Sequence, residues 1–519
     1  MFRKKFSFRE KVTLHPIMTL LILIGATIVI SGILSFFGAQ VTYNKVDSNL
    51  LEYTPSTIQV NSLLSLRGLK YIFANTVLNF VSFTPLSSLI IILIGFGIME
   101  KSGFLKTAIT LLTKKAKKKT VTFALVLISI LLSLTGDLSF IVMIPLAGVL
   151  FKYGKRNPAI GIIAVFAAMT CGTGLSLFLT SVDSSLLSQT LLGASVLDPS
   201  YTASTFAFIF IMLVSIIAIA MLITKITEEY TAKKHYKYEF DEADSIEEEV
   251  SDKLDPKVKR GLLFALVAGS IYLLFFIYNI IPGLPLSGNL LDYSQVHYID
   301  KLFSYNSFFS NGFVFIVTML FVILGFFYGI GAKTIKNNKE FSDALGHSLD
   351  GTGRTLVLIF FAATFVSIFK QTNIGPYVVA NLANFISKSG FSGFTLIIAI
   401  FLVAAISTIV LPSSLSKWAI LAGTIVPVSM NAGISPEFSQ IIFRYGECMT
   451  IGLTPLFAYF VIYLAYLEKY NQKSRPLSLF ETLKYQVPYS LLAGLVLLII
   501  IIIWYIIGLP IGIGASPVI

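Results

Sequence analysis

The apolar run from 121 to 152 constrains this chain more than any other segment, because lysines flank it on both sides and polar residues break it. Basic residues precede the run at 114–119 and follow it at 152–156, while Ser133-Leu-Thr-Gly-Asp137 forms the break. Positive charge marks the cytoplasmic side of a membrane protein, so both ends are predicted on one side. We expect a hairpin that re-enters the membrane and turns at a polar tip. An ionisable group at that depth, Asp137, is a functional candidate.

The composition assigns the chain to the polytopic membrane proteins. Of its 519 residues, 55% are hydrophobic and 13% are charged, whereas soluble domains carry about 25% charged residues. The net charge of +12 lies in short segments between apolar stretches, so we expect no nucleic-acid partner. Cys171 and Cys448 both lie in apolar segments and indicate no disulfide framework. The histidines show no metal-ligand spacing, and we expect neither a metal site nor a cofactor.

Nine other apolar stretches are long enough to span a bilayer. A second broken run occupies 391–430, is interrupted near Pro412, and is expected to form a second re-entrant hairpin. If the N-terminus is cytoplasmic, the cytoplasmic segments hold 31 of the 39 lysines and arginines, in agreement with the positive-inside rule. The predicted spans are about 16–38, 82–99, 158–190, 202–224, 259–281, 311–331, 353–370, 436–467 and 485–508.

The two halves of the chain are predicted to repeat one series of elements in opposite orientation. Residues 1–230 carry the cytoplasmic-side hairpin, a charged cytoplasmic linker fills 231–258, and residues 259–519 carry the external-side hairpin. In each half a span, a hairpin, a broken span and a last span follow one another. The broken spans are 158–190, interrupted at Cys171-Gly-Thr-Gly174, and 436–467, where Gly452 and Pro455 are expected to unwind the helix. Inverted repeats with discontinuous helices are the signature of secondary transporters. We therefore predict an all-α, inverted-repeat transporter with nine transmembrane helices and two re-entrant hairpins.

The tip of the second broken run holds side chains suited to bind a substrate. Ser414 and Ser416 supply hydroxyl groups, Lys417 supplies a positive charge, and Trp418 offers a flat surface for stacking. A helix N-terminus at such a tip attracts anions through its free N–H groups. The alternative is that the serines bond to the preceding turn and that the tryptophan sits at the membrane interface.

Charged side chains also fall inside the two broken spans. Arg444 and Glu447 are three residues apart, so they share a helical face and can pair. A charged pair within a span is costly unless it serves a site, although an ion pair that only fixes packing is the alternative. Asp183 is a candidate for binding a proton or a coupling ion, or else an aspartate that caps a helix.

Motifs spread over nearly the whole chain follow a known pattern. They are Gly95-Phe-Gly-Ile-Met-Glu-Lys-Ser-Gly103, Asp137 in its tip, Ile144-Pro145-Leu146, Lys417-Trp418-Ala-Ile-Leu, Ser435-Pro436-Glu437 and the segment 444–455. In this combination the chain resembles the AbgT (p-aminobenzoyl-glutamate) transporter family. The resemblance implies a homodimer with an ion-transporter-like fold that moves p-aminobenzoyl-glutamate, and in some members exports sulfonamide antimetabolites, driven by an ion or proton gradient. The family's functional positions fall on Asp183, Trp418, Pro436, Arg444 and Pro455.

The chain departs from the family pattern at four positions. Ser176 and Ile451 stand where the family tends to have asparagine, Glu447 where it tends to have aspartate, and Leu415 where it tends to have serine. The two lost amide groups remove oxygens that could ligate sodium, and Ser176, Thr450 and backbone carbonyls could replace them. The predicted ion-coupling residues are Asp137, Ser176, Asp183, Glu447 and Thr450.

The sequence thus predicts a secondary active transporter of the cytoplasmic (inner) membrane with a small anionic substrate. Ser414, Ser416, Lys417, Trp418, Pro436, Arg444 and Pro455 are the predicted substrate-binding residues. Na⁺ or a proton would be the coupling ion, and membrane lipid would surround the protein. The alternatives are a carrier for another small carboxylate, such as a dicarboxylate or a peptide-like acid, and an intramembrane enzyme. An enzyme is not expected, because Lys417 beside Ser416 is the only pair in an apparent tip that could suggest catalysis.

Overall fold

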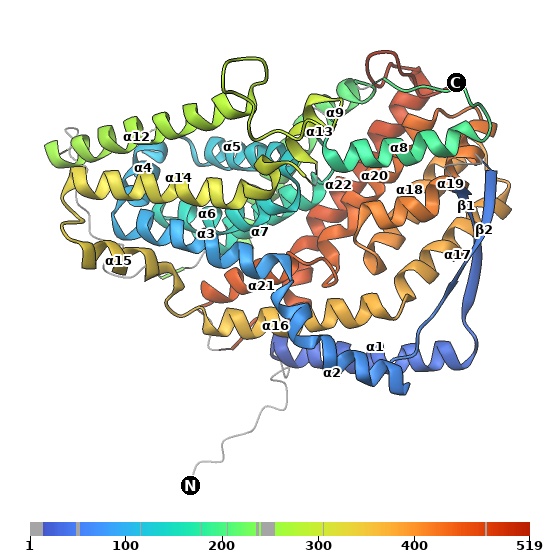
Figure 1. Ribbon diagram of the computed structural model, residues 1–519, viewed down its shortest axis with the longest axis horizontal. Coiled ribbons are helices and arrows are strands. Elements are labelled where there is room, and N and C mark those ends of the chain that lie inside the picture. The colour runs from blue at the N-terminus through green and yellow to red at the C-terminus, as the bar shows by residue number, and fades with distance from the viewer. Residues whose placement is uncertain are drawn as a thin grey trace, which may run out of the picture.

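The computed structural model describes residues 14–47, 52–114, 116–177, 179–204, 206–234, 238–239, 255–304, 306–472 and 475–519. These residues are mostly helical (Figure 1). Within them, nine helical segments are long and apolar enough to cross a membrane. These candidates are Pro16–Phe36, Leu66–Lys101, Lys118–Gly136, Ile209–Lys234, Pro256–Ile280, Phe308–Ala332, Gly353–Gln371, Gly393–Val410 and Leu479–Ile507.

The number of candidate spans agrees with the prediction, but two members of the set differ. The predicted spans 158–190 and 436–467 are each divided in two, and the first arms of the two broken apolar runs stand in their place. Glycine and proline in the sequence explain the divisions, and both breaks were predicted. The divided elements are α7 (Pro158–Cys171), α8 (Ser181–Ser195), α20 (Pro436–Thr450), the 3-10 turn η4 (Ile451–Leu453) and α21 (Phe460–Lys469).

The helices of both broken runs are interrupted at the predicted tips. The first run consists of α5 (Lys118–Leu131), η1 (Leu132–Leu138) and α6 (Ser139–Tyr153), with a left-handed φ of 70° at Gly136 inside η1. The second consists of α18 (Gly393–Val410) and α19 (Ser414–Asn431). That either run re-enters the membrane stays a prediction. Asp137 belongs to η1, but its side chain lies outside the described part of the structure.

One series of elements occurs twice along the chain. In the first half α3 (Thr84–Lys101) leads through the left-handed residue Gly103 into α4 (Phe104–Thr113), the first broken run, α7, α8 and α9 (Ile209–Ile226). In the second half α16 leads through the left-handed residue Asn373 into α17, the second broken run, α20, α21 and α22. The bounds of these last elements are α16 (Gly353–Gln371), α17 (Ile374–Ser389) and α22 (Leu479–Ile507).

The remaining elements surround these two series. β1 and β2 pair antiparallel from Gln40 opposite Gln59 to Asp47 opposite Glu52, and the ribbon lies against α17 and α19 at one end of the molecule (Figure 1). This ribbon was not predicted. The other elements are α1 (Pro16–Phe36), β1 (Gln40–Asp47), β2 (Glu52–Gln59), α2 (Leu66–Val81), the π-helical turn η2 (Thr227–Thr231), α10 (Ala232–Lys234), α12 (Pro256–Ile280), α13 (Tyr298–Phe303), α14 (Phe308–Ala332), α15 (Asn338–Gly346) and η3 (His347–Leu349).

Burial separates an inner group of helices from an outer one. Nearly every residue of α7 and α20 is buried. In contrast, α12 exposes most of its apolar side chains. It packs along α14, and α14 in turn packs along α3. An apolar helix that is exposed in this way is suited to lipid. The broken spans therefore lie inside, where their interrupted backbone is surrounded by protein.

Candidate functional site

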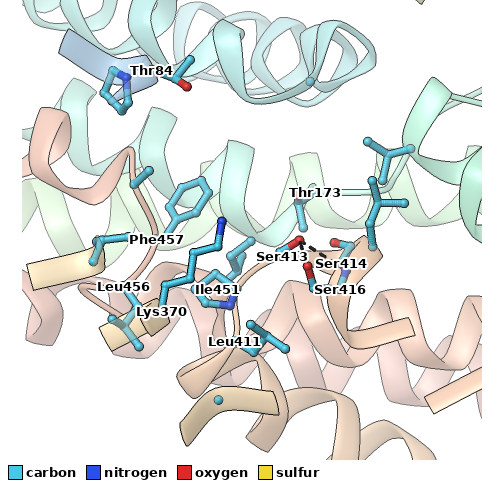
Figure 2. A pocket seen from close by; sticks show the side chains of 18 of the residues that line it. Thr84, Thr173, Lys370, Leu411, Ser413, Ser414, Ser416, Ile451, Leu456 and Phe457 are labelled. Carbon is cyan, nitrogen blue, oxygen red and sulfur yellow. Dashed lines mark hydrogen bonds between the residues drawn. The ribbon is translucent and has the colours of Figure 1, made fainter. Parts of the chain in front are cut away.

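The two tips and the two broken spans meet at one large cavity of about 1010 Å³ (Figure 2). Residues 133–136 of the first tip and 410–416 of the second line it. The break after α7 contributes Thr173 and Gly174, and the break after α20 contributes Ile451 and Phe457. Segments from both halves of the chain thus surround a single space, as the predicted transporter requires.

Four helix N-termini and two cations are part of the described lining of this cavity. α3, α8, α17 and α19 all begin at its wall, with Thr84, Ser181, Gly375 and Ser414 among the lining residues. Free N–H groups at these ends favour negative charge. Arg444 and Lys370 also line the cavity, and no aspartate or glutamate does so among the residues whose side chains are described. The cavity is therefore suited to an anion.

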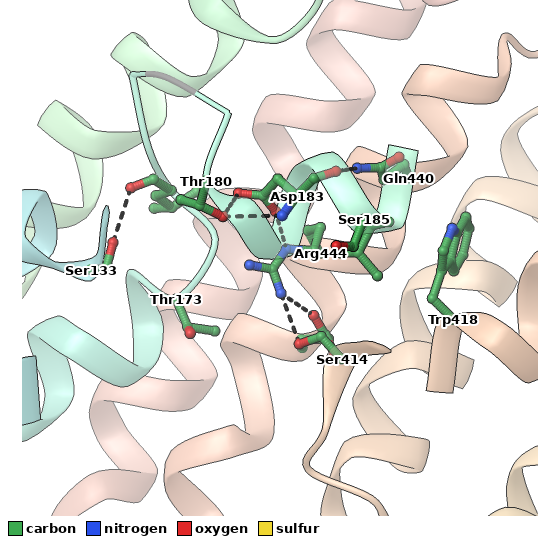
Figure 3. Close-up of polar contacts among 12 residues, drawn as sticks. Ser133, Thr173, Thr180, Asp183, Ser185, Ser414, Trp418, Gln440 and Arg444 are labelled. Carbon is green, nitrogen blue, oxygen red and sulfur yellow. Dashed lines mark hydrogen bonds and ion pairs between the residues drawn. The ribbon is translucent and has the colours of Figure 1, made fainter. Parts of the chain in front are cut away.

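A row of four charged side chains lies behind the second tip. Figure 3 shows two of them, Asp183 and Arg444, together with Ser414. Nε of Arg444 lies 3.0 Å from Oδ1 of Asp183, and Nη1 lies 2.6 Å from Oε2 of Glu447. Oε1 of Glu447 in turn lies 2.5 Å from Nζ of Lys417. Nη1 of Arg444 also donates to Oγ of Ser414, at 2.9 Å. The row Asp183–Arg444–Glu447–Lys417 joins α8, α20 and α19, and its formal charges sum to zero.

Asp183 is held in place by the start of α8. Thr180 caps this helix, accepting from the backbone N–H of Asp183 at 3.0 Å and donating its hydroxyl to Oδ2 at 2.7 Å. Nε2 of Gln440 donates to the carbonyl oxygen of Asp183 at 3.3 Å. The sequence analysis did not single out Thr180 or Gln440, although Thr180 and Asp183 have the spacing of a capping box.

Lys417 and Trp418 are fully buried and do not line the cavity. Nζ of Lys417 donates to Oγ1 of Thr408 at 2.6 Å in addition to its pairing with Glu447. The ring of Trp418 packs on Phe443 with 4.5 Å between centroids, and its Nε1 donates to Oγ1 of Thr190 at 2.9 Å. Both side chains support the tip from behind, and their roles in substrate binding stay predictions.

The other predicted site residues are distributed around the cavity at different distances. Ser414 and Ser416 line it directly, and Ser176 lines a small adjoining hollow together with Asp183 and Arg444. Thr450 is buried and donates to the carbonyl oxygen of Ala405 at 2.7 Å. Pro455 lines a separate small hollow, and Pro436 is buried at the start of α20. Of the predicted site residues, the structure thus brings Ser414, Ser416 and Arg444 to the cavity wall.

The sequence analysis also missed Lys370. Lys370 follows an apolar span. Lysines are common at the ends of spans, so no local sequence pattern distinguishes Lys370 as a site residue.

The described residues form no group of three or more histidine, cysteine, aspartate or glutamate side chains that could hold a metal ion.

Apolar helices in this number, with paired broken helices around one shared cavity, define a multi-pass membrane transporter. The chain belongs to the AbgT transporter family, whose model matches residues 10–519. Membership decides against the intramembrane enzyme considered from the sequence, because the family is one of transporters.

Three relatives illustrate the match. The p-aminobenzoyl-glutamate transport protein of Escherichia coli (strain K12) is 25% identical over 503 residues, which cover 97% of this chain and 94% of that protein. Neisseria gonorrhoeae MtrF, described as illuminating a class of antimetabolite efflux pumps, is 30% identical over 97% of this chain and 98% of its own, with a TM-score of 0.48. The Alcanivorax borkumensis YdaH transporter is 26% identical over 96% of this chain and 100% of its own, with a TM-score of 0.47.

Proposed function

We propose that this chain carries a small organic anion across the cytoplasmic membrane, and that p-aminobenzoyl-glutamate is its substrate. The observation that carries the proposal is the cavity lining, where four helix N-termini and two cations face one space without a described carboxylate. The relative from Escherichia coli, which is named for p-aminobenzoyl-glutamate transport, supports the choice of substrate. At about 1010 Å³ the cavity is at the upper end of the range for small-molecule sites, about 300–1,000 Å³.

The two chemical parts of p-aminobenzoyl-glutamate match different parts of this lining. Its carboxylates suit the N–H groups that begin α8 and α19 and the cationic side chains. Its benzoyl ring suits the aromatic side chains of Phe140, Phe303 and Phe457, which also line the cavity. A substrate with an anionic end and an aromatic end would therefore be held in a defined orientation.

We further propose that the charged row couples transport to a proton or sodium gradient. Arg444 pairs with both Asp183 and Glu447. Protonation of Asp183 would neutralise one of these two partners, and the guanidinium could then bind a substrate carboxylate instead. Loss of that proton would return Arg444 to Asp183 and weaken substrate binding. Sodium is the other candidate, bound by the carbonyls that the broken helices free, together with Ser176 and Thr450.

Counterflow in proteoliposomes tests the proposed function. Proteoliposomes that contain the purified protein and are preloaded with unlabelled p-aminobenzoyl-glutamate are expected to accumulate the labelled compound transiently. Proton and sodium gradients imposed separately should identify the coupling ion. A neutral aromatic amide should not compete, because it lacks the charge that the cavity selects. If dicarboxylates exchange while p-aminobenzoyl-glutamate does not, the proposed substrate is wrong and a dicarboxylate carrier takes its place.

A further inference from the structure

Lys370 is a cation at the cavity wall, and it has no counter-charge among the residues whose side chains the structure describes. It lies in the last turn of α16, its side chain is exposed, and Figure 2 shows it extended into the cavity. No hydrogen bond or ion pair joins its ammonium group to any residue that the structure describes.

Arg444 differs from Lys370 in its electrostatic balance. The guanidinium is already paired with the carboxylates of Asp183 and Glu447, so it offers N–H donors to the cavity but little net charge. Lys370 is therefore the uncompensated cation among the described lining residues. An exposed cation beside apolar groups such as Ile451 and Phe457 interacts more strongly with an arriving anion than one surrounded by bulk water.

The backbone around Lys370 is fixed by contacts with other elements. The backbone N–H of Asn61 donates to the carbonyl oxygen of Thr372 at 2.9 Å, and Nδ2 of Asn61 donates to that of Gln371 at 3.1 Å. On the other side of the turn, α17 approaches the second tip so closely that a Cβ on Gly375 would lie 2.8 Å from the carbonyl oxygen of Val410. The backbone that follows Lys370 is thus held in place by Asn61 and by the second tip.

We propose that Lys370 binds the second carboxylate of a dianionic substrate and makes the transporter selective for dianions. This proposal rests on the proposed function, and it names the residue that distinguishes a diacid from its monoacid. One carboxylate would lie at Arg444 and the α19 N-terminus, and the other would lie at Lys370, which lines the same cavity. The competing explanation is that Lys370 only complements the dipole at the C-terminal end of α16. That role would affect stability but would leave discrimination between the two substrates unchanged.

The test compares p-aminobenzoyl-glutamate with p-aminobenzoyl-glutamine, in which the side-chain carboxylate is replaced by a neutral amide. Counterflow is measured for the wild type, Lys370→Gln, Lys370→Arg and the control Lys388→Gln, which removes an exposed lysine from the end of α17 away from the cavity. Lys370→Gln is expected to raise the KM for the glutamate compound about tenfold, since a charge-assisted hydrogen bond is lost. The KM for the glutamine compound should stay within about twofold, and Lys370→Arg and Lys388→Gln should retain the preference for the diacid.

Failure of this proposal can be distinguished from failure of the proposed function. If the wild type shows no counterflow of p-aminobenzoyl-glutamate, the proposed function is wrong and the selectivity proposal, which depends on it, is overturned as well. If the wild type transports both compounds with equal KM, or if Lys370→Gln keeps the wild-type ratio of the two KM values, only the role of Lys370 is wrong. The comparison within the wild type needs no variant, so equal KM values for the two compounds would overturn the proposal even if Lys370→Gln does not fold.

Discussion

Replacing Glu447 with glutamine is expected to destabilise the folded protein by about 3–5 kcal/mol, because it leaves a buried cation without its counter-charge. Lys417 and Glu447 both have side chains with 0% exposure and lie 2.5 Å apart. In the variant, Nζ of Lys417 would keep the hydroxyl of Thr408 as a neutral partner. The loss should appear as a lower midpoint of thermal unfolding in detergent micelles.

A second substitution and a control isolate the electrostatic cause. Combining Lys417→Met with Glu447→Gln removes both charges, and Arg444 still pairs with Asp183, so the double variant should recover much of the lost stability. Glu229→Gln changes an exposed glutamate and should leave the midpoint unchanged. Equal midpoints for Glu447→Gln and the wild type would show that Glu447 does not balance the buried lysine.

Only part of the charged row could be predicted from the sequence. The pairing of Arg444 with Glu447 was predicted and is confirmed, because three-residue spacing places both on one face of a helix. Asp183 and Lys417 were each named as separate candidates. The ion pairs of Asp183 with Arg444 and of Lys417 with Glu447 depend on how α8 and α19 pack against α20. Spacing along the sequence does not encode such packing.

The fold was predicted best where glycine, proline and charge interrupt an apolar run. Breaks at both tips and in both broken spans follow directly from those residues. The β1–β2 ribbon was not predicted, because its strands are too short and too polar to resemble membrane spans. In β1 the side chains of Val41, Tyr43 and Val46 are nevertheless buried. α17 was missed because only one face of it is apolar, which a search for continuous apolar stretches overlooks.

Trp418 shows a different kind of limit. Its position beside the tip suggested a surface for substrate stacking. In the structure the ring has 0% exposure and packs against Phe443, and its stacking on a substrate stays a prediction. Whether a side chain next to a site faces that site depends on helix rotation, and here Ser414 and Ser416 turn to the cavity while Lys417 and Trp418 turn away. A sequence gives the proximity of such residues more readily than their direction.

The second large effect is expected at Gly174, where an added methyl group should displace Arg444 and reduce transport. Gly174 has a left-handed φ of 77°, and a Cβ built there would lie closer than 3.0 Å to Nη2, Cζ and Nε of Arg444. The guanidinium therefore packs flat against the glycine, and this contact fixes the geometry of its pairs with Asp183 and Glu447. In Gly174→Ala the initial rate of counterflow should fall at least about tenfold, since each 1.4 kcal/mol of lost binding lowers affinity tenfold.

Gly283→Ala separates the contact with Arg444 from backbone strain. Gly283 has a left-handed φ of 91° with no atom within 4 Å of an added Cβ, so alanine there adds only the conformational cost, about 1–2 kcal/mol. Both variants carry that cost, and Gly174→Ala adds the cost of displacing Arg444 from its buried pairs. Only Gly174→Ala should lose transport, because only there does the new methyl group meet the guanidinium. If both variants transport equally well, the position of Arg444 does not depend on Gly174, and the charged row tolerates displacement of its central residue.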